Sequence, residues 1–355
     1  MEKVKSGSVA FTYAGCVVGA GFLSGQELWQ FFGSYGKLGV FGFILAIILQ
    51  AIVCCIILVY AKSTKIYEFD KLIVKNEIKP LRWFFIVMEM IFIFSVVMIM
   101  FAGSGSLIET AFGLNDIYGS IIFALLVTLV AFLGLNGMVK ILSMTIPLLT
   151  VLTLIISILA LNKYGFPTIS NAEVTGKTAL MPNFVVAFIL FSVHNIFCTL
   201  GVLAPLGNEM EDDKTAIKGM SIASIVFIII TLSVLLPLYS MPEFAKNDLP
   251  MLDLAKTVNT PLFYIYAVLL LIGMFGSAIS HFVSMVDFSC RKSEFFKKHN
   301  YAIILLIAIL AFVLSRFGFS TLISVMYPLS GYIGVIALGL IIYYYIKLKT
   351  NKNVD

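Results

Sequence analysis

The chain has 355 residues, of which 60% are hydrophobic and only 12% are charged, and its formal net charge is +5. A soluble domain carries about 25% charged residues, so this composition argues against a soluble protein and predicts an integral membrane protein. The positive charges are scattered over segments between apolar runs, which argues against a nucleic-acid partner and favours a membrane-topology signal.

About ten apolar runs follow one another along the chain, each long enough, or nearly so, for the roughly 20 helical residues that cross a bilayer. Lipid cannot satisfy backbone polar groups, so continuous apolar runs of this length predict helices. The fold class predicted is therefore all-α and polytopic, with about ten transmembrane helices. The runs cover residues 8–33, 38–60, 81–112, 117–136, 138–161, 182–207, 216–239, 261–288, 300–316 and 319–346.

The first run is interrupted by glycine and polar residues between Val17 and Glu27. A glycine-rich break at mid-membrane frees backbone N–H and C=O groups, which is tolerable beside a cavity that holds a polar solute or ion. We therefore predict a broken helix with solute bound at Gly19, Ala20 and Gly21. The alternative is that these glycines only permit close packing of neighbouring helices.

The sixth run carries a similar polar interruption. Ser192, His194 and Asn195 stand together at mid-depth, followed by Thr199 and Gly201. Two broken helices at matching positions of two halves are the strongest sequence indication of a transport site. We therefore predict a second broken helix here, with Ser192, His194 and Asn195 in the solute site.

The spacing of the runs predicts two five-helix halves, residues 1–165 and 166–355, within a single membrane unit. Because five is odd, the second half enters from the opposite side and forms an inverted repeat. With the N-terminus inside, 18 of the 24 Lys and Arg residues lie on the inner side. The positive-inside rule then predicts a multi-pass protein of the bacterial cytoplasmic membrane with both termini cytoplasmic.

Ionisable residues within membrane helices are costly and usually functional. Glu27, just beyond the first break, is a candidate for binding solute or carrying a proton. His194 and His281 are further candidate proton carriers because histidine titrates near neutral pH. Glu89 fits a buried structural role, and Glu109, near a helix end, fits a solvated one.

Enzyme signatures are missing from the sequence. There is no His-Glu-x-x-His motif, no Walker-type phosphate loop and no Cys-x-x-Cys pair. The three histidines, His194, His281 and His299, are too far apart in sequence to form a local metal cluster. We therefore expect no catalytic activity and no resident cofactor.

The string Ala14–Gly21 resembles the unwound first helix of the LeuT-type fold of the amino acid–polyamine–organocation superfamily. Its extension through Gln26 and Glu27 to Phe31, Phe32, Tyr35 and Gly36 is similar to the YkvI-like bacterial membrane proteins. The resemblance implies that the first, second, sixth and seventh helices move against a scaffold of the third, fourth, eighth and ninth. It also implies that an ion drives transport, either Na⁺ or a proton.

The resemblance further implies a sodium site. The carbonyls of Gly15 and Val18 match two ligands in the first helix, and Gly273 and Ser277 match a carbonyl and a hydroxyl in the eighth. A second sodium site is not expected, because Cys16 and Phe22 occupy its ligand positions. A basic residue before the first helix pairs with an acid ending the eighth in such proteins, which assigns Lys3, Lys5 and Asp287 to an inner gate. The alternative is that the two lysines only follow the positive-inside rule.

The function predicted is ion-coupled symport of a small organic solute, an amino acid or a related amine. The alternative is a non-transporting receptor on the same fold, which would bind the solute without net flux. The expected partners are the solute and the lipid bilayer. The sequence predicts neither the particular solute nor the oligomeric state.

Overall fold

The computed structural model describes residues 3–74, 78–133, 138–169, 178–292 and 294–352, and within these ranges the regular structure is helical. The helices, in chain order, are α1 (Ser6–Val17), α2 (Ala20–Leu23), α3 (Gln26–Phe31), α4 (Lys37–Thr64), α5 (Phe69–Ile73), α6 (Lys79–Phe112), α7 (Asp116–Leu133), α8 (Met138–Tyr164), α9 (Phe184–Glu209), α10 (Asp213–Ser240), α11 (Pro250–Val258), α12 (Thr260–Lys292), α13 (Glu294–Lys298), α14 (Asn300–Ser315) and α15 (Phe319–Lys352), with 3₁₀ turns η1 (Gly33–Tyr35) and η2 (Phe244–Lys246).

Within the described residues each predicted apolar run falls on helical structure, and residues 134–136 of the fourth run lie outside them. Seven helices of the described chain, α4, α6, α8, α9, α10, α12 and α15, are long and apolar enough to span a bilayer. The shorter α7 and α14 are also apolar. The first run is divided into α1, α2 and α3, as its glycines predict. These helices define a multi-pass membrane protein.

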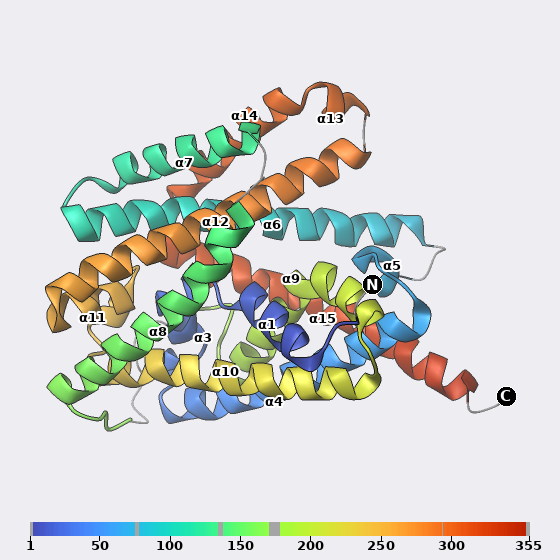
Figure 1. The fold of residues 1–355 in the computed structure, drawn as a ribbon, viewed down its shortest axis with the longest axis horizontal. Coiled ribbons are helices and arrows are strands. Elements are labelled where there is room, and N and C mark those ends of the chain that lie inside the picture. Colours follow the sequence, from blue (N-terminus) through green and yellow to red (C-terminus); the bar gives the residue numbers. More distant parts are fainter. Residues whose placement is uncertain (1–2, 75–77, 134–137, 170–177, 293, 353–355) are drawn as a thin grey trace.

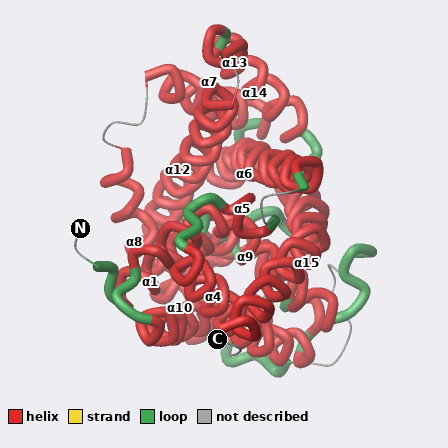
Figure 2. Tube along the Cα trace, turned by 90° about the vertical axis from the view of Figure 1, so that its right-hand side faces the viewer, coloured by secondary structure: helices red, strands yellow, loops and turns green. Residues whose placement is uncertain are grey.

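The helices form two groups. α1, α4, α9 and α10 contact one another, and α6, α7, α12 and α14 form the other group. Figure 1 shows the second group along one side of the molecule, with α1, α4 and α10 on the other. Figure 2, turned by 90°, likewise shows α6, α7, α12 and α14 together. α8 and α15 each contact both groups. The predicted moving bundle and scaffold correspond to these two groups.

Contacts at one end of the molecule join the segments predicted to be inside. The amide of Val4 donates to the carbonyl of Glu209 at 2.9 Å, and Lys62 pairs with Asp213 at 3.3 Å. Both termini lie toward this end in Figure 1, as does α5, where Asp70 pairs with Arg82. We refer to it as the inner end.

The opposite end joins the segments predicted to be outside. The hydroxyl of Tyr35 donates to the carbonyl of Met181, and that of Tyr239 donates to the carbonyl of Gly36 at 3.1 Å. α11 lies at this outer end in Figure 1. The contacts therefore separate the segments as the charge pattern predicts.

The prediction of a second broken helix is wrong. α9 is one continuous helix from Phe184 to Glu209. The physical reason is that its polar side chains bond back to their own helix. Asn195 Nδ2 donates to the carbonyl of Phe191 at 3.0 Å, and Thr199 Oγ1 donates to the carbonyl of Asn195 at 2.8 Å. Such bonds satisfy polar side chains without releasing the backbone.

Candidate functional site

The break after α1 leaves backbone groups without partners. Val18 leaves the helical region with ψ 83°, and Gly19 is extended with φ −101° and ψ −176°. Among the described hydrogen bonds, none engages the carbonyls of Gly15, Cys16 and Val18, or the amides of Ala20 and Gly21. Free carbonyls on one side and free amides on the other suit a site for both cations and anions.

Glu27 turns back from α3 toward this break. Gly25 makes the turn before α3 with φ +90°, a conformation that suits glycine. A Cβ added at Gly21 would lie 3.6 Å from Glu27 Oε2 and 3.6 Å from the Tyr327 hydroxyl. The carboxylate and the hydroxyl therefore both lie beside Gly21. Glu27 is only 4% exposed, so it faces the interior of the protein.

His194 reaches the same region from α9. Its ring stacks on that of Tyr327 with centroids 4.2 Å apart, and its Nδ1 contacts Ser330 Oγ. The Ser330 hydroxyl donates to the carbonyl of Tyr327 at 2.7 Å, so Nδ1–H of His194 must donate to Ser330. Nε2 of a neutral His194 is then the proton acceptor of the ring. Cys198 Sγ lies 3.6 Å from Nδ1.

α12 approaches the break from the other helix group. A Cβ added at Gly19 would lie 4.0 Å from Ser277 Oγ, which places the hydroxyl beside the break. Gly273 is buried one turn away on the same helix. His281 Nδ1 lies 2.7 Å from the carbonyl of Ser277, so that nitrogen donates to the helix backbone. Tyr266 also supports the break by donating its hydroxyl to the carbonyl of Leu23 at 2.7 Å.

Two of the predicted solute-site residues engage backbone groups. Ser192 Oγ donates to the carbonyl of Phe188 at 2.7 Å and lies 3.2 Å from that of Ala46, against α4. Asn195 is buried and uses its amide on its own helix. Neither contact reaches the break, in contrast to the contacts of His194.

The predicted inner gate is not joined in this structure. Lys3, Lys5 and Asp287 are all exposed. Among the ion pairs of the described residues, none links either lysine to Asp287.

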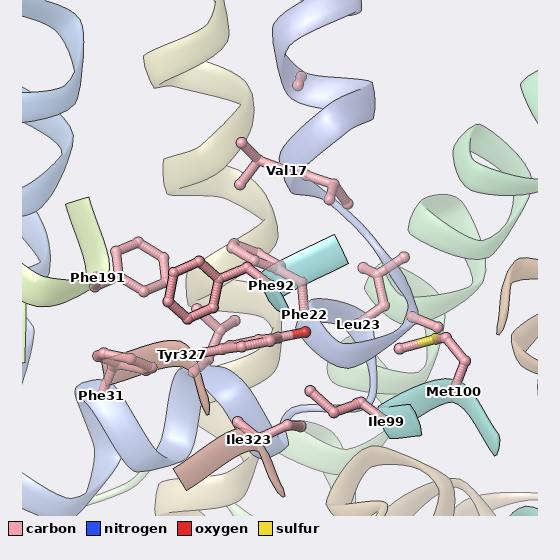
Figure 3. Close-up of a cluster of buried hydrophobic side chains, with 14 of the residues drawn as sticks. Val17, Phe22, Leu23, Phe31, Phe92, Ile99, Met100, Phe191, Ile323 and Tyr327 are labelled. Carbon is pink, nitrogen blue, oxygen red and sulfur yellow. The ribbon is translucent and has the colours of Figure 1, made fainter. Parts of the chain in front are cut away.

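Hydrophobic side chains enclose the break. Figure 3 shows Phe22 and Leu23 of α2 among aromatic and aliphatic side chains, with the Tyr327 hydroxyl directed toward this segment. The ring of Phe22 lies 6.4 Å from that of Phe191. The unpaired backbone groups therefore lie in an apolar surrounding, where electrostatic interactions with a ligand are strong. Among the described residues, no cluster of three or more His, Cys, Asp and Glu could hold a metal ion.

The outer end is covered above this site. The amide of Met251 at the start of α11 donates to the carbonyl of Ser24 at 2.9 Å. Asp248 accepts from Ser106 at 2.6 Å and from the amide of Ser320 at 3.2 Å. The side-chain amide of Gln30 donates to the carbonyl of Ser320 at 3.0 Å. The break is therefore closed off from the outer side.

The inner half presents polar faces instead. α12 exposes Ser280, Ser284 and Asp287, whereas α1 exposes Phe11 beside Thr12 and Cys16. The outer half of α12 exposes apolar residues such as Ile265 and Val268, as expected beside lipid. Exposed hydroxyl and carboxylate groups at the inner half indicate contact with water.

Sequence reasoning missed Tyr327 and Ser330 of α15. A signal was present, because the segment Tyr327-Pro328-Leu329-Ser330-Gly331 places polar residues, a proline and a glycine inside an apolar run. The spacing of the apolar runs did not predict that this segment lies beside the break in the first run. The two segments are about three hundred residues apart in sequence.

Two proteins of Bacillus subtilis (strain 168) are similar along almost the whole chain. The uncharacterized membrane protein YkvI is 24% identical over 341 residues, covering 95% of each chain. The uncharacterized protein YyaD is 24% identical over 338 residues, covering 94% of this chain and 95% of its own. No protein-family profile matches the chain. The similarity to YkvI thus extends far beyond the first helix.

Among solved structures, the inward-facing conformation of Mhp1 matches with a TM-score of 0.68 and 14% identity, covering 96% of this chain and 76% of Mhp1. Mhp1, a nucleobase-cation-symport-1 family transporter, also matches in a closed conformation with bromovinylhydantoin bound, with a TM-score of 0.52 and 13% identity, over 94% of this chain and 72% of its own. The chain is therefore a multi-pass membrane protein that shares the LeuT-type fold of Mhp1.

Proposed function

We propose that this protein is a secondary active transporter that moves a small organic solute by alternating access around the break between α1 and α2. The observation that carries the proposal is the convergence of three helices on that break. Glu27 of α3 and Tyr327 of α15 lie beside Gly21, and Ser277 of α12 lies beside Gly19. These polar groups lie where the two helix groups meet.

The charge of the site favours a solute with an amino group. Glu27 is buried, and no described Lys or Arg side chain is buried with it. An ammonium group near Glu27 would neutralise the carboxylate, while the free amides of Ala20 and Gly21 could bind a solute carboxylate. An amino acid or a related amine fits both features.

The architecture we propose is ten transmembrane helices in a 5+5 inverted repeat, residues 1–165 and 166–355. The order of the elements supports it. The short α5 lies between the second and third spans of the first half, and the short α11 lies between those of the second half. We place the inner end with both termini in the bacterial cytoplasm, following the distribution of Lys and Arg.

Alternating access is supported by the difference between the two ends. Contacts of Met251 and Asp248 cover the site from outside, whereas the inner half of α12 exposes the polar residues Ser280, Ser284 and Asp287. This is the arrangement of an inward-open state. Lys3 or Lys5 would pair with Asp287 only after the inner side closes.

A cation site accompanies the solute site in this proposal. The free carbonyls of Gly15 and Val18, with Gly273 and Ser277, offer the oxygen ligands that suit a hard cation such as Na⁺. His194, His281 and Glu27 remain candidates for carrying a proton.

The test is uptake into proteoliposomes. Labelled alanine, lysine and putrescine are offered with inward gradients of Na⁺ and protons. Gly19→Leu and Gly21→Leu should abolish uptake of the transported probe, because the new side chains fill the space at the break. Gly339→Leu on α15, where a Cβ meets nothing within 4 Å, is the matched control.

Normal uptake by both break variants would refute the site. Binding of a probe without any net flux would instead identify a receptor on this fold.

A further inference from the structure

The buried acidic residues of the protein are not balanced by buried cations. The described interior contains the carboxyl groups of Glu27, Asp70 and Glu89. Asp70 pairs with Arg82, but none of the ion pairs between described residues includes Glu27 or Glu89. A carboxylate isolated from water is costly, so each of these two groups requires a proton or a bound cation.

The two carboxyl groups differ in what they face. Glu27 lies beside Gly21, where the solute is proposed to bind. Glu89 lies on α6, in the other helix group, and is 5% exposed. Its Oε2 has no hydrogen-bond partner among the described residues. Phe92, one turn along the same face of α6, belongs to the hydrophobic cluster of Figure 3. Glu89 is thus a buried acid away from the break.

A chain of buried groups connects the two acids. Phe92, one turn from Glu89, packs its ring 6.0 Å from that of Phe197 on α9, and Cys198 follows Phe197 directly. Cys198 contacts His194, which stacks on Tyr327, and the Tyr327 hydroxyl lies with Glu27 Oε2 beside Gly21. The cluster joins α3, α15 and α9 to α6. Glu89 therefore lies close to the place where α6 packs against α9, the helix that carries His194.

The other elements packed against α6 bring few titratable groups to it. Asp70 of α5 is paired with Arg82, and Asp116 of α7 is paired with Arg316 near the outer end. Toward the middle of the remaining helices lie His194 and Cys198 of α9, Tyr327 of α15 and His281 of α12. The other titratable or charged groups of these elements are exposed, as Tyr332 is, or stand nearer to helix ends: Glu209, Tyr264, Tyr266, Asp287, Cys290, Arg291, Lys292, Tyr301, Tyr332, Tyr343, Tyr344, Tyr345, Lys347, Lys349 and Lys352. His281 uses Nδ1 on its own helix, and Tyr301 is exposed. No described buried Lys or Arg competes with a proton for Glu89.

We propose that Glu89 carries the proton that drives transport, while Glu27 binds the solute. The inference rests on the proposed transport function. A charged Glu89 needs water and keeps the site open, whereas a neutral carboxyl can be covered by α9. Protonation thus permits the helix groups to close.

The proton balance of the cycle is simple. Glu89 carboxylate takes a proton from a hydronium ion on the outer side, forming an O–H bond and leaving water. On the inner side that bond breaks, and the proton passes to water, either directly or through Nε2 of His194. The carboxylate is regenerated, and no oxidation or reduction takes place.

The first experiment needs no solute. Infrared difference spectra of the purified full-length protein between acid and alkaline pH should show the carbonyl band of a protonated carboxyl group. Glu89→Gln should lose one such component, whereas Glu89→Asp should keep it at a shifted position. Glu109→Gln, at an exposed position near the outer end of α6, is the matched control. A spectrum unchanged by Glu89→Gln overturns the proposal.

The second readout separates coupling from binding. The probe is whichever of alanine, lysine and putrescine the wild type transports. Glu89→Gln should lose uptake of this probe driven by a proton gradient, but it should retain exchange of internal for external probe. Glu27→Gln should lose both. Gradient-driven accumulation by Glu89→Gln overturns the proposal. If no probe is transported, the transport function itself is in question, and the infrared component alone decides the protonation of Glu89.

Discussion

A polar side chain inside this protein either bonds to its own helix or reaches another one. Asn195 and Thr199 take the first course. His194 takes the second through Ser330, and Tyr266 does so by donating to the carbonyl of Leu23. Residues of the second kind connect helices at the break, so they are better candidates for function. Residue type alone does not separate the two kinds.

Ser277 is the residue at which a sodium site can be tested directly. In the wild type, Na⁺ should raise the melting temperature of the detergent-purified protein relative to choline. Ser277→Ala should remove that increment, because no other described side-chain hydroxyl lies within 4 Å of the Gly19 position. A bound ligand stabilises the folded state by mass action.

Ser289→Ala is the matched control for Ser277. It lies on the same helix, and its hydroxyl donates to the carbonyl of Met285 at 2.8 Å, away from the break. If sodium stabilises Ser277→Ala as much as the wild type, the cation does not bind at this hydroxyl. A proton is then left as the coupling ion, and the role proposed for Glu89 is unaffected.

At the scale of the element, glycine spacing decides which helix breaks. The first run has glycines at 15, 19, 21 and 25, whereas α9 has neither glycine nor proline between Ser192 and Thr199. Sequence analysis therefore predicted the break in the first run and failed in α9, because it treated a cluster of polar residues as equivalent to a cluster of glycines. Serine, threonine and asparagine bond back to helix carbonyls, and glycine cannot.

The start of α10 gives a prediction on pH. Asp212 is the N-cap, accepting from the Thr215 hydroxyl at 2.7 Å and from the Thr215 amide at 2.8 Å. The bond from the Thr215 hydroxyl has the larger effect and the bond from the amide the smaller one, and both lower the pKa of Asp212 below its ordinary value of 3.8. The stabilisation is therefore present above the ordinary pKa and is lost as the pH falls through the lowered pKa of the folded state.

Asp212→Ala should accordingly melt below the wild type at pH 7. The difference should shrink as the pH of the melts is lowered below 3.8 and through the lowered pKa of the folded state, where the wild-type carboxylate becomes protonated. Asp212→Asn keeps an acceptor at the cap, so its stability relative to Asp212→Ala should not vary with pH. A wild-type advantage that persists unchanged in acid would show that the charge of the cap contributes nothing.

At the scale of the whole molecule, the sequence predicted the helices well because each run had to be helical in lipid. It also predicted which loops share an end, because Lys and Arg mark one side. It could not predict that α15 contributes Tyr327 to the break, or that Phe92, one turn from Glu89, packs against Phe197 of α9. Both depend on how the two helix groups pack, and side-chain contacts between distant helices leave no periodic signal.

The conformation of the whole molecule can be tested with its own cysteines. Cys16 on α1 is exposed and Cys54 on α4 is buried. In single-cysteine variants, a membrane-impermeant maleimide should label Cys16 from the cytoplasmic side only, and Cys54 from neither side. The reason is that Cys16 is exposed in the last turn of α1, directly before the break that is proposed to open inward, whereas Cys54 is buried. A Cys16 that resists the reagent from the cytoplasmic side would place this face against lipid or protein.

The maleimide labelling of Cys16 also tests the predicted inner gate. A Lys–Asp pair near water contributes at most about 1 kcal/mol, which corresponds to roughly a fivefold change in a two-state equilibrium. If Lys3 or Lys5 pairs with Asp287 when the inner side is closed, Asp287→Asn should raise the labelling rate of Cys16 by up to about that factor. Asp213→Asn, which removes the Lys62 partner at the same end, is the control for a general loss of charge. Equal labelling in Asp287→Asn and the wild type would leave Asp287 as a charge at the membrane edge, with closure governed instead by the contacts around the break.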